Sequence, residues 1–146
     1  MGGHVNPIKN SVSFVIYHKD RTRFLLVKRP PEEDRLPDVW GLPAGSLKEG
    51  ETFEEAVIRS GREKLGVELK IVRKMGEGEI DRGDYRLRMK AYEVEIIHGE
   101  PQVPQPIRGI TQYTQWKWGR PEDLVEAAQK GSLCCRLYLS STHQSW

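Results

Sequence analysis

The stretch of sequence that decides the fold is GSLKEGETFEEAVIRSGREKLGV, residues 45–67. Its first part contains two glycines and indicates a loop, and its second part carries the signals of a helix. Thr52 followed three residues later by Glu55 forms a capping-box pattern, and acidic residues in the first turn suit the helix dipole. Gly66 is a natural helix end. The stretch therefore predicts a loop followed by an amphipathic helix, whose apolar face is formed by Phe53, Ala56, Val57 and Leu65.

Segments of strand character flank this helix on both sides. The segment SVSFVIYH (11–18) alternates apolar and polar residues, which predicts a strand. The segment RFLLVKR (23–29) follows after a polar turn and predicts a hairpin partner or an adjacent strand. Further strands are predicted at 67–76, at 85–97 and near 112–118.

The remaining segments are predicted to be loops and one closing helix. The proline-rich segments 30–38 and 99–109 indicate loops, and the acids at 77 and 79 are expected in a turn. A helix is predicted from Pro121, a favoured first helical residue, to near Gly131. Strands on both sides of a central helix, with a second helix at the end, predict an α/β or α+β sandwich built on a mixed sheet.

Length and composition indicate one globular domain over residues 1–146. A chain of 146 residues with 37% hydrophobic and 30% charged residues can bury a core without disulfides or metals. No apolar run approaches the roughly 20 residues of a membrane span, and the N-terminus lacks a secretion-signal pattern. The net charge of +2 argues against nucleic acid as a partner. The adjacent Cys134 and Cys135 are expected to be reduced structural thiols of a cytoplasmic protein.

A wider pattern joins the loop and the helix. Within residues 45–67, the spacing of Gly45, Glu51, Arg59, Glu63 and Gly66 resembles the Nudix box, the loop-helix-loop with which that family holds divalent cations against a pyrophosphate. The segments DVWGLPAG (38–45), LLVKRP (25–30) and WKWGRPEDL (116–124) are similar to the segments that family members place around the box. The resemblance covers nearly the whole chain and implies an α/β/α sandwich around a mixed β-sheet.

The resemblance implies a hydrolase that cleaves a pyrophosphate bond in a nucleoside triphosphate or a nucleoside diphosphate derivative with Mg²⁺ or Mn²⁺. A pyrophosphate carries dense negative charge, and a divalent cation both neutralises that charge and positions the attacking water. Such cations prefer carboxylate oxygens, and helix positions i, i+3 and i+4 place three acids on one face. Relatives often pair, which suggests a homodimer.

The resemblance also assigns individual residues. Glu63 and the backbone carbonyl of Ala44 correspond to metal ligands. Glu51 and Arg59 correspond to an ion pair that joins the loop to the helix. The structural part of the motif therefore comprises Gly45, Glu51, Arg59 and Gly66.

The chain departs from the family's pattern at two acidic positions. Ser60 stands where the family has a glutamate that serves as metal ligand or base, and Lys64 replaces another metal-ligand glutamate. An ammonium in place of a carboxylate changes the local charge by two units. The catalytic candidates are accordingly Glu63, Ser60 and Lys64. Substitute metal ligands, or else solvated surface acids, are Glu54, Glu55, Glu77 and Glu79.

Later residues supply candidates for substrate binding. Arg86 and Arg88 share one strand face and form either a cationic wall for phosphate or a solvated sheet face. Trp116 and Trp118 either stack a nucleobase or pack at the core. Gln115 stands where many relatives carry an acid.

Two function classes follow from these residues. The first is a metal-dependent pyrophosphate hydrolase, favoured by the retained ends of the box. The second is a catalytically weak or inactive domain that binds a nucleotide-like ligand as a sensor or regulatory module, favoured by Ser60, Lys64 and Gln115. A third class is a domain that binds an RNA end or another nucleic acid, suggested only by the basic run 82–90 and the tryptophans.

Overall fold

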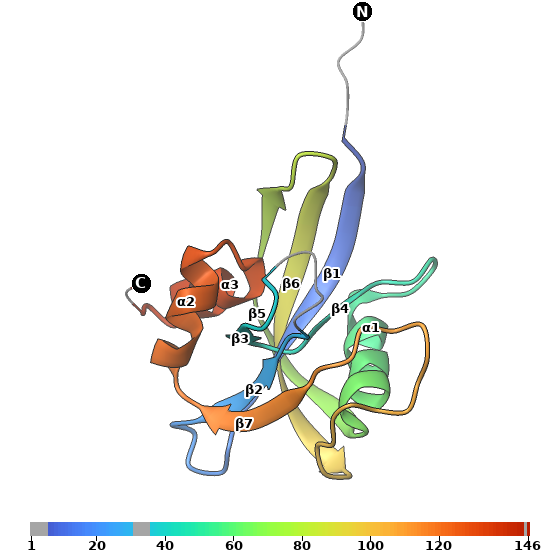
Figure 1. Ribbon diagram of the computed structural model, residues 1–146, viewed down its shortest axis with the longest axis vertical. Helices are drawn as coiled ribbons and strands as arrows, with labels where there is room; N and C mark the ends of the chain where they lie inside the picture. The colour runs from blue at the N-terminus through green and yellow to red at the C-terminus, as the bar shows by residue number, and fades with distance from the viewer. Residues whose placement is uncertain (1–5, 31–35, 145) are drawn as a thin grey trace, which may run out of the picture.

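A four-stranded mixed sheet forms the centre of the protein in a computed structural model that describes residues 6–30, 36–144 and 146 (Figure 1). Its strand order is β4 (Ala44–Ser46), β1 (Ile8–Ile16), β6 (Arg86–His98) and β5 (Glu68–Asp81). Strands β1 and β6 are parallel, and the other two pairs are antiparallel. An antiparallel second sheet has the order β3 (Trp40–Gly41), β2 (Phe24–Lys28) and β7 (Gln115–Gly119).

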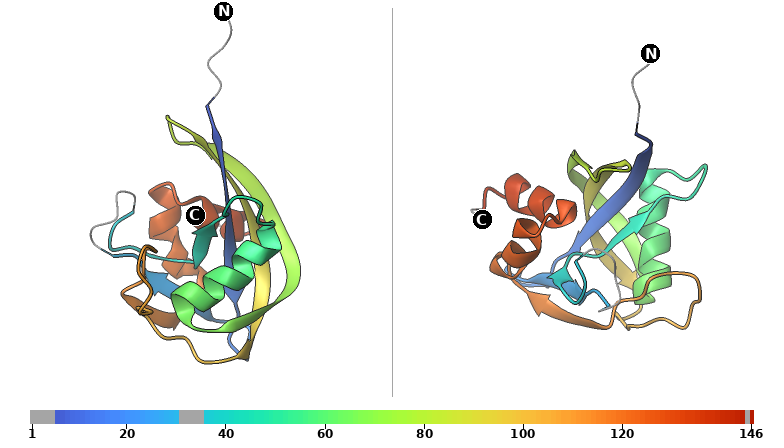
Figure 2. Two further views of the ribbon diagram at one scale, coloured as in Figure 1. Left: turned by 90° about the vertical axis from the view of Figure 1, so that its right-hand side faces the viewer. Right: turned by 45° about the horizontal axis from the view of Figure 1, so that its top comes forward.

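Helices cover both faces of the central sheet. Helix α1 (Phe53–Ser60) packs on one face, while α2 (Val125–Gln129) and α3 (Leu133–Ser141) lie on the other side (Figures 1 and 2). The alternation of β1 explains this arrangement, because successive side chains point to opposite faces. Val12 and Phe14 pack with the α1 side of the core, and Val15 packs with the α3 side. The predicted α/β/α sandwich around a mixed sheet is confirmed.

The central helix begins as its capping box predicts. The Thr52 hydroxyl accepts from the Glu55 backbone N–H at 3.1 Å, and the Glu55 carboxylate accepts from the Thr52 N–H at 2.9 Å. After Ser60 the chain continues as a π-helical turn, η1 (Gly61–Leu65), which the sequence analysis did not anticipate. Gly66 ends it with a left-handed φ of 72°, as predicted.

Gly61 explains how this turn approaches the sheet. A Cβ atom on Gly61 would lie 2.5 Å from Leu69 Cδ1 on β5. Gly61 therefore packs closely against β5. Because the turn carries Glu63 and Lys64, this contact helps to set the position of both side chains.

The structure corrects two predicted elements. The segments 11–18 and 23–29 do not form a regular hairpin, because β1 and β2 belong to different sheets and share only the bridge between Tyr17 and Phe24. Strand β5 continues to Asp81, so Glu77 and Glu79 lie in a strand rather than in a turn. Residues 31–35 of the predicted loop 30–38 lie outside the described residues.

The closing helix is also different from its prediction. Residues 121–124 form a 3₁₀ turn, η2 (Pro121–Leu124), and α2 ends at Gln129. A further helix, α3, follows Ser132, whose hydroxyl accepts from the Cys135 N–H. Its sequence was missed because it lacks a strong helical pattern and follows directly after Gly131. None of the helices in the described part of the chain has the length and apolar character of a membrane span.

The contact between Gly61 and Leu69 generates a stability prediction. Gly61→Ala should lower the free energy of unfolding by about 1–3 kcal/mol, because the new methyl group overlaps a buried side chain. Gly76→Ala is the matched control, since its Cβ atom would lie no closer than 3.9 Å to any atom of the described chain. Urea unfolding of both variants measures the difference. Equal stabilities would show that the turn can shift away from β5.

Candidate functional site

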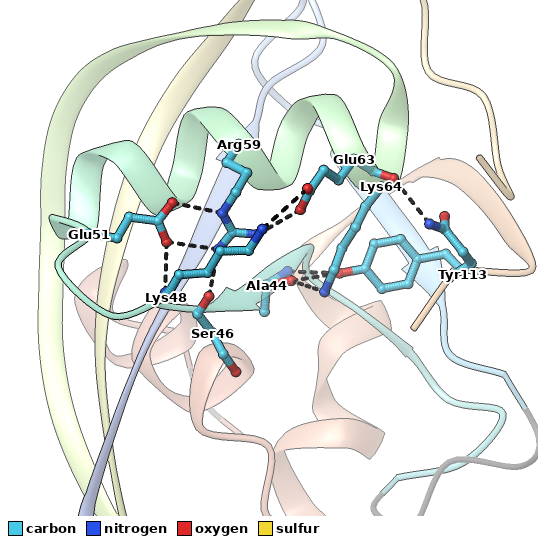
Figure 3. A network of polar contacts seen from close by, with 9 residues as sticks. Ala44, Ser46, Lys48, Glu51, Arg59, Glu63, Lys64 and Tyr113 are labelled. Atoms are coloured by element: carbon cyan, nitrogen blue, oxygen red, sulfur yellow. Dashed lines mark hydrogen bonds and ion pairs between the residues drawn. The ribbon is translucent and has the colours of Figure 1, made fainter. Parts of the chain in front are cut away.

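Arg59 joins the loop of the box to its helix (Figure 3). Its Nε and Nη2 atoms donate to the two carboxylate oxygens of Glu51 at 2.7 and 2.9 Å. The Nη2 atom also donates to the backbone carbonyl of Ser46 at 2.7 Å. The hydrogen bonds from Arg59 lower the pKa of Glu51, and the same bonds raise the pKa of Arg59. This geometry matches the structural ion pair that the sequence resemblance implies.

Glu63, the predicted metal ligand, is held by basic side chains. One carboxylate oxygen accepts from Arg59 Nη1 at 2.7 Å, and the other lies 3.7 Å from Lys48 Nζ. The Glu63 backbone carbonyl accepts from the Gln112 side chain at 3.1 Å. The carboxylate is 20% exposed. Both of its oxygens therefore already face a cation.

Lys64 reaches across to the other predicted metal ligand, the carbonyl of Ala44. Its Nζ atom donates to that oxygen at 2.6 Å. The Tyr113 hydroxyl donates to the same oxygen at 3.1 Å and lies 2.9 Å from the Ala44 N–H. The Lys64 ammonium also lies 5.3 Å from the centre of the Tyr113 ring, a distance at which cation–π attraction operates. Figure 3 shows Lys64 and Tyr113 meeting at Ala44.

Ser60 lies beneath the loop, against Gly45. The residue is fully buried, and its hydroxyl has no hydrogen-bond partner among the described residues. A Cβ atom on Gly45 would lie 2.2 Å from the Ser60 Oγ atom, so only glycine fits at position 45. The structure thus brings Ala44, Gly45 and Ser60 together with Glu63 and Lys64.

The charges around the box do not suit a divalent cation. Lys48 and Arg59 pair with the carboxylates of Glu51 and Glu63, and Lys64 adds a positive charge at the Ala44 carbonyl, so these five side chains sum to one positive charge. Two like unit charges about 4 Å apart cost about 4 kcal/mol at an effective dielectric constant of about 20. With glutamates at positions 60 and 64, as in the family's pattern, the same group would have two negative charges in excess.

The substitute acids proposed from the sequence have other partners, although Glu54 and Glu55 line a pocket together with Glu51 and Arg59 of the box. Glu54 accepts from the Tyr92 hydroxyl, Glu55 caps α1, and Glu77 pairs with Lys74. Glu79 pairs with Arg86 and Arg88. Within the described ranges, no three acidic, histidine or cysteine side chains gather as a metal-binding group. Since the Ala44 carbonyl is also engaged, the residues present do not fit Mg²⁺ or Mn²⁺, which prefer several oxygen ligands.

An open cavity of about 260 Å³ adjoins Ala44 and Lys64. The charged side chains that line it, among the residues that the structure describes, are all basic: Arg29, Lys64 and Arg82. Apolar side chains from β6 and α3 also line it: Leu87, Met89 and Leu133. The cavity therefore offers both basic and apolar side chains to a ligand.

Cys134 also lines this cavity and modifies its charge. A hydrogen bond with Cys135 lowers the pKa of the Cys134 thiol to about 6, with smaller contributions from Ser132 and the charge of Arg29. The same pairing, together with burial, raises the pKa of Cys135. Both cysteines are free and buried, as expected. The lowered pKa makes Cys134 an acidic group in the lining, beside the basic Arg29, Lys64 and Arg82.

The predicted substrate-binding residues lie away from this cavity. Arg86 and Arg88 alternate along β6 with Leu87 and Met89, which line it, so the arginines point to the opposite face. Trp116 is half-buried in the α1-side core and meets Trp118 edge to face, with ring centres 5.7 Å apart.

The sequence analysis missed several residues that the fold brings to the cavity. No role is predicted for Arg29 within LLVKRP, although its place at the end of a predicted strand could have indicated one. Arg82 was noted only within the basic run 82–90. For Tyr113 no signal existed, because its partner Ala44 is 69 residues away in the chain.

The fold and this site define a class of protein. The model of the NUDIX domain family matches residues 7–133, and the chain therefore belongs to the Nudix family.

Individual relatives agree with this assignment. The chain is 28% identical over 109 residues to the nucleoside triphosphatase NudI of Escherichia coli, covering 70% of this chain and 76% of that protein. Among solved structures it resembles a MutT protein from Methanosarcina mazei (TM-score 0.73, 15% identity, 97% of each chain). It also resembles a MutT NUDIX hydrolase from Burkholderia pseudomallei (TM-score 0.67, 26% identity, 81% of this chain and 87% of that one).

The Glu51–Arg59 pair makes stability depend on pH. Because the pKa of Glu51 is lower in the folded protein than its ordinary value of 4.5, the pair stabilises the fold above about that pH. Its contribution is lost as the pH falls below that value. Glu51→Gln should cost about 1.5–3 kcal/mol at pH 7 and much less near pH 2. Urea unfolding of wild type and Glu51→Gln across this pH range measures the difference in their free energies of unfolding. A difference that does not change with pH would contradict the lowered pKa of Glu51.

The buried hydroxyl of Ser60 generates a second prediction. Ser60→Ala should leave the free energy of unfolding unchanged or raise it by about 1 kcal/mol, because a buried hydroxyl without a partner is unfavourable. Ser132→Ala is the control and should cost about 1 kcal/mol, since that hydroxyl caps α3. Urea unfolding compares the two. A stable Ser60→Ala protein that loses ligand binding or turnover would favour the catalytic role predicted from the sequence.

Proposed function

We propose that this Nudix domain binds the phosphates of a nucleotide or a nucleoside diphosphate derivative in the cavity beside Ala44, and that it is weak or inactive as a metal-dependent hydrolase. The observation that carries the proposal is the cavity's charge. Its charged lining within the described chain is basic, and it adjoins a box whose residues do not fit a divalent cation.

The two kinds of side chain that line the cavity suit the two parts of a nucleotide. Lys64, Arg29 and Arg82 all line it, and Arg side chains bind phosphate oxygens through paired N–H groups. Leu87 and Met89, together with the ring of Tyr85, offer an apolar surface for a base. The name of the relative NudI, a nucleoside triphosphatase, supports a nucleotide as ligand.

Hydrolysis of a pyrophosphate bond with Mg²⁺ or Mn²⁺ is the second candidate function. Two observations favour it: the Glu63 side chain remains partly exposed, and the Glu51–Arg59 pair is intact. Ser60 and Lys64 would then be parts of a working variant site. A cytoplasmic location, a homodimer and a single domain over 1–146 stay predictions that accompany either function.

Binding to the cavity is tested by calorimetry with ADP, ATP, inorganic pyrophosphate and adenosine. The three phosphate compounds should bind and adenosine should not. Arg29→Met should weaken binding at least tenfold, because a hydrogen bond to a charged group is worth about 1.5–3 kcal/mol. Arg23→Met is the matched control, since that arginine pairs with Asp20 in the turn before β2. Circular dichroism confirms that both variants fold.

Two outcomes would contradict the cavity as the binding site. Equal affinities for Arg29→Met and the control would place the phosphates elsewhere. A loss of affinity in Arg88→Met, on the opposite face of β6, would favour the substrate-binding role that the sequence predicted for Arg86 and Arg88.

Turnover is tested separately with the same nucleotides while Mg²⁺ and Mn²⁺ are titrated. The proposed binding function predicts no turnover that depends on these cations. Divalent-dependent turnover that is lost in Glu63→Gln would establish the hydrolase instead.

A further inference from the structure

We infer that the Lys64 ammonium has replaced the divalent cation of the Nudix site, so that the chain neutralises ligand phosphates with its own side chain. The part of this inference that concerns the ligand rests on the proposed function. The part that concerns the metal stands on the geometry of the box alone.

The position of the ammonium is the first argument. The resemblance assigns the Ala44 carbonyl to the metal, and Lys64 Nζ lies 2.6 Å from that oxygen. Tyr113 donates to the same oxygen at 3.1 Å. A carbonyl oxygen has two lone pairs, and both are engaged. A cation from solution would therefore have to displace Lys64 before it could bind Ala44.

The charge balance is the second argument. Lys64 replaces an acid by a base, while Ser60 removes another acid, and the remaining carboxylates of Glu51 and Glu63 are matched by Arg59 and Lys48. The group carries one positive charge in excess with no added ion. It already has the sign that phosphates require.

The ammonium also remains available to a ligand. An ammonium group has three N–H donors, and the hydrogen bond to Ala44 uses one of them. The side chain is half-buried and lines the cavity together with Arg29 and Arg82. A phosphate in the cavity can therefore accept from Lys64 without breaking its contact with Ala44.

Neighbouring residues fix Lys64 in this place. Gln112 donates to the Glu63 carbonyl at 3.1 Å, and the next residue, Tyr113, clamps the Ala44 peptide. The segment 112–113 therefore holds both ends of the Lys64–Ala44 contact. Gly61 also helps to position the π-helical turn, because it packs closely against Leu69 of β5. These contacts together hold the Lys64 ammonium at the Ala44 carbonyl.

The metal part is tested by Mn²⁺ titration followed by electron paramagnetic resonance. Wild-type protein should show no Mn²⁺ binding tighter than the millimolar range. Lys64→Glu should bind Mn²⁺ at least tenfold more tightly than wild type, and Lys64→Met should not reach that affinity. Lys130→Glu is the control for net charge, because Lys130 lies far from the box at the end of α2. Circular dichroism and urea unfolding confirm that each variant folds.

The ligand part is tested with inorganic pyrophosphate by calorimetry. Wild type should bind it in EDTA, with less than a threefold change when Mg²⁺ replaces EDTA. Lys64→Met should weaken binding at least tenfold. Lys64→Glu should lose binding in EDTA and recover it when Mn²⁺ is added, since the metal then takes the place of the ammonium.

The outcomes separate the two proposals. Micromolar Mn²⁺ binding by wild type, or no gain in Lys64→Glu over Lys64→Met, would overturn the replacement of the metal while leaving nucleotide binding standing. Pyrophosphate binding that requires Mg²⁺ in wild type would overturn it as well. If neither pyrophosphate nor any nucleotide binds, the proposed function is wrong, and the Mn²⁺ titration still decides whether Lys64 has replaced the metal.

Discussion

The guanidinium of Arg59 is the interaction on which the rest of the site depends. It holds Glu51 from the loop, Glu63 from the π-helical turn and the Ser46 carbonyl at the end of β4. One planar group thus fixes three parts of the chain. A lysine could not do this, because its single ammonium lacks the fork of five donors. With the loop and turn fixed, Lys64 can reach the Ala44 carbonyl.

The same constraint explains why this Nudix domain differs from a metal site. In a metal site the carboxylates share a dication, and their mutual repulsion is relieved only when the ion binds. Here Glu63 is already paired with Arg59 and Lys48, and Lys64 holds Ala44. Both the Glu63 carboxylate and the Ala44 carbonyl therefore have cationic partners without an added ion. The loop-helix-loop of the family is kept, and the cation that lies at the Ala44 carbonyl is the Lys64 ammonium.

The position of the cavity follows from the two faces of the sheet. The box helix packs on one face, whereas the cavity lies toward α3 and is lined by Leu87 and Met89 of β6. Strand β4, at the edge of the sheet, joins the two sides through Ala44 and Gly45. Lys64 passes from the helix to this edge. A ligand can therefore contact the box while its body packs on the other face.

Local patterns along the sequence determined the fold class and the frame of the box. The capping box, the end at Gly66 and the Glu51–Arg59 pair depend on residues near one another in the chain, so their spacing alone predicted them. Only the tertiary structure decided the contacts of the Ala44 carbonyl with Lys64 and Tyr113, which lie 20 and 69 residues away in the chain. It also decided that Arg86 and Arg88 face away from the cavity while Arg29 enters it. Spacing sets which side chains share an element, but packing sets which elements meet and which face of each strand adjoins the cavity.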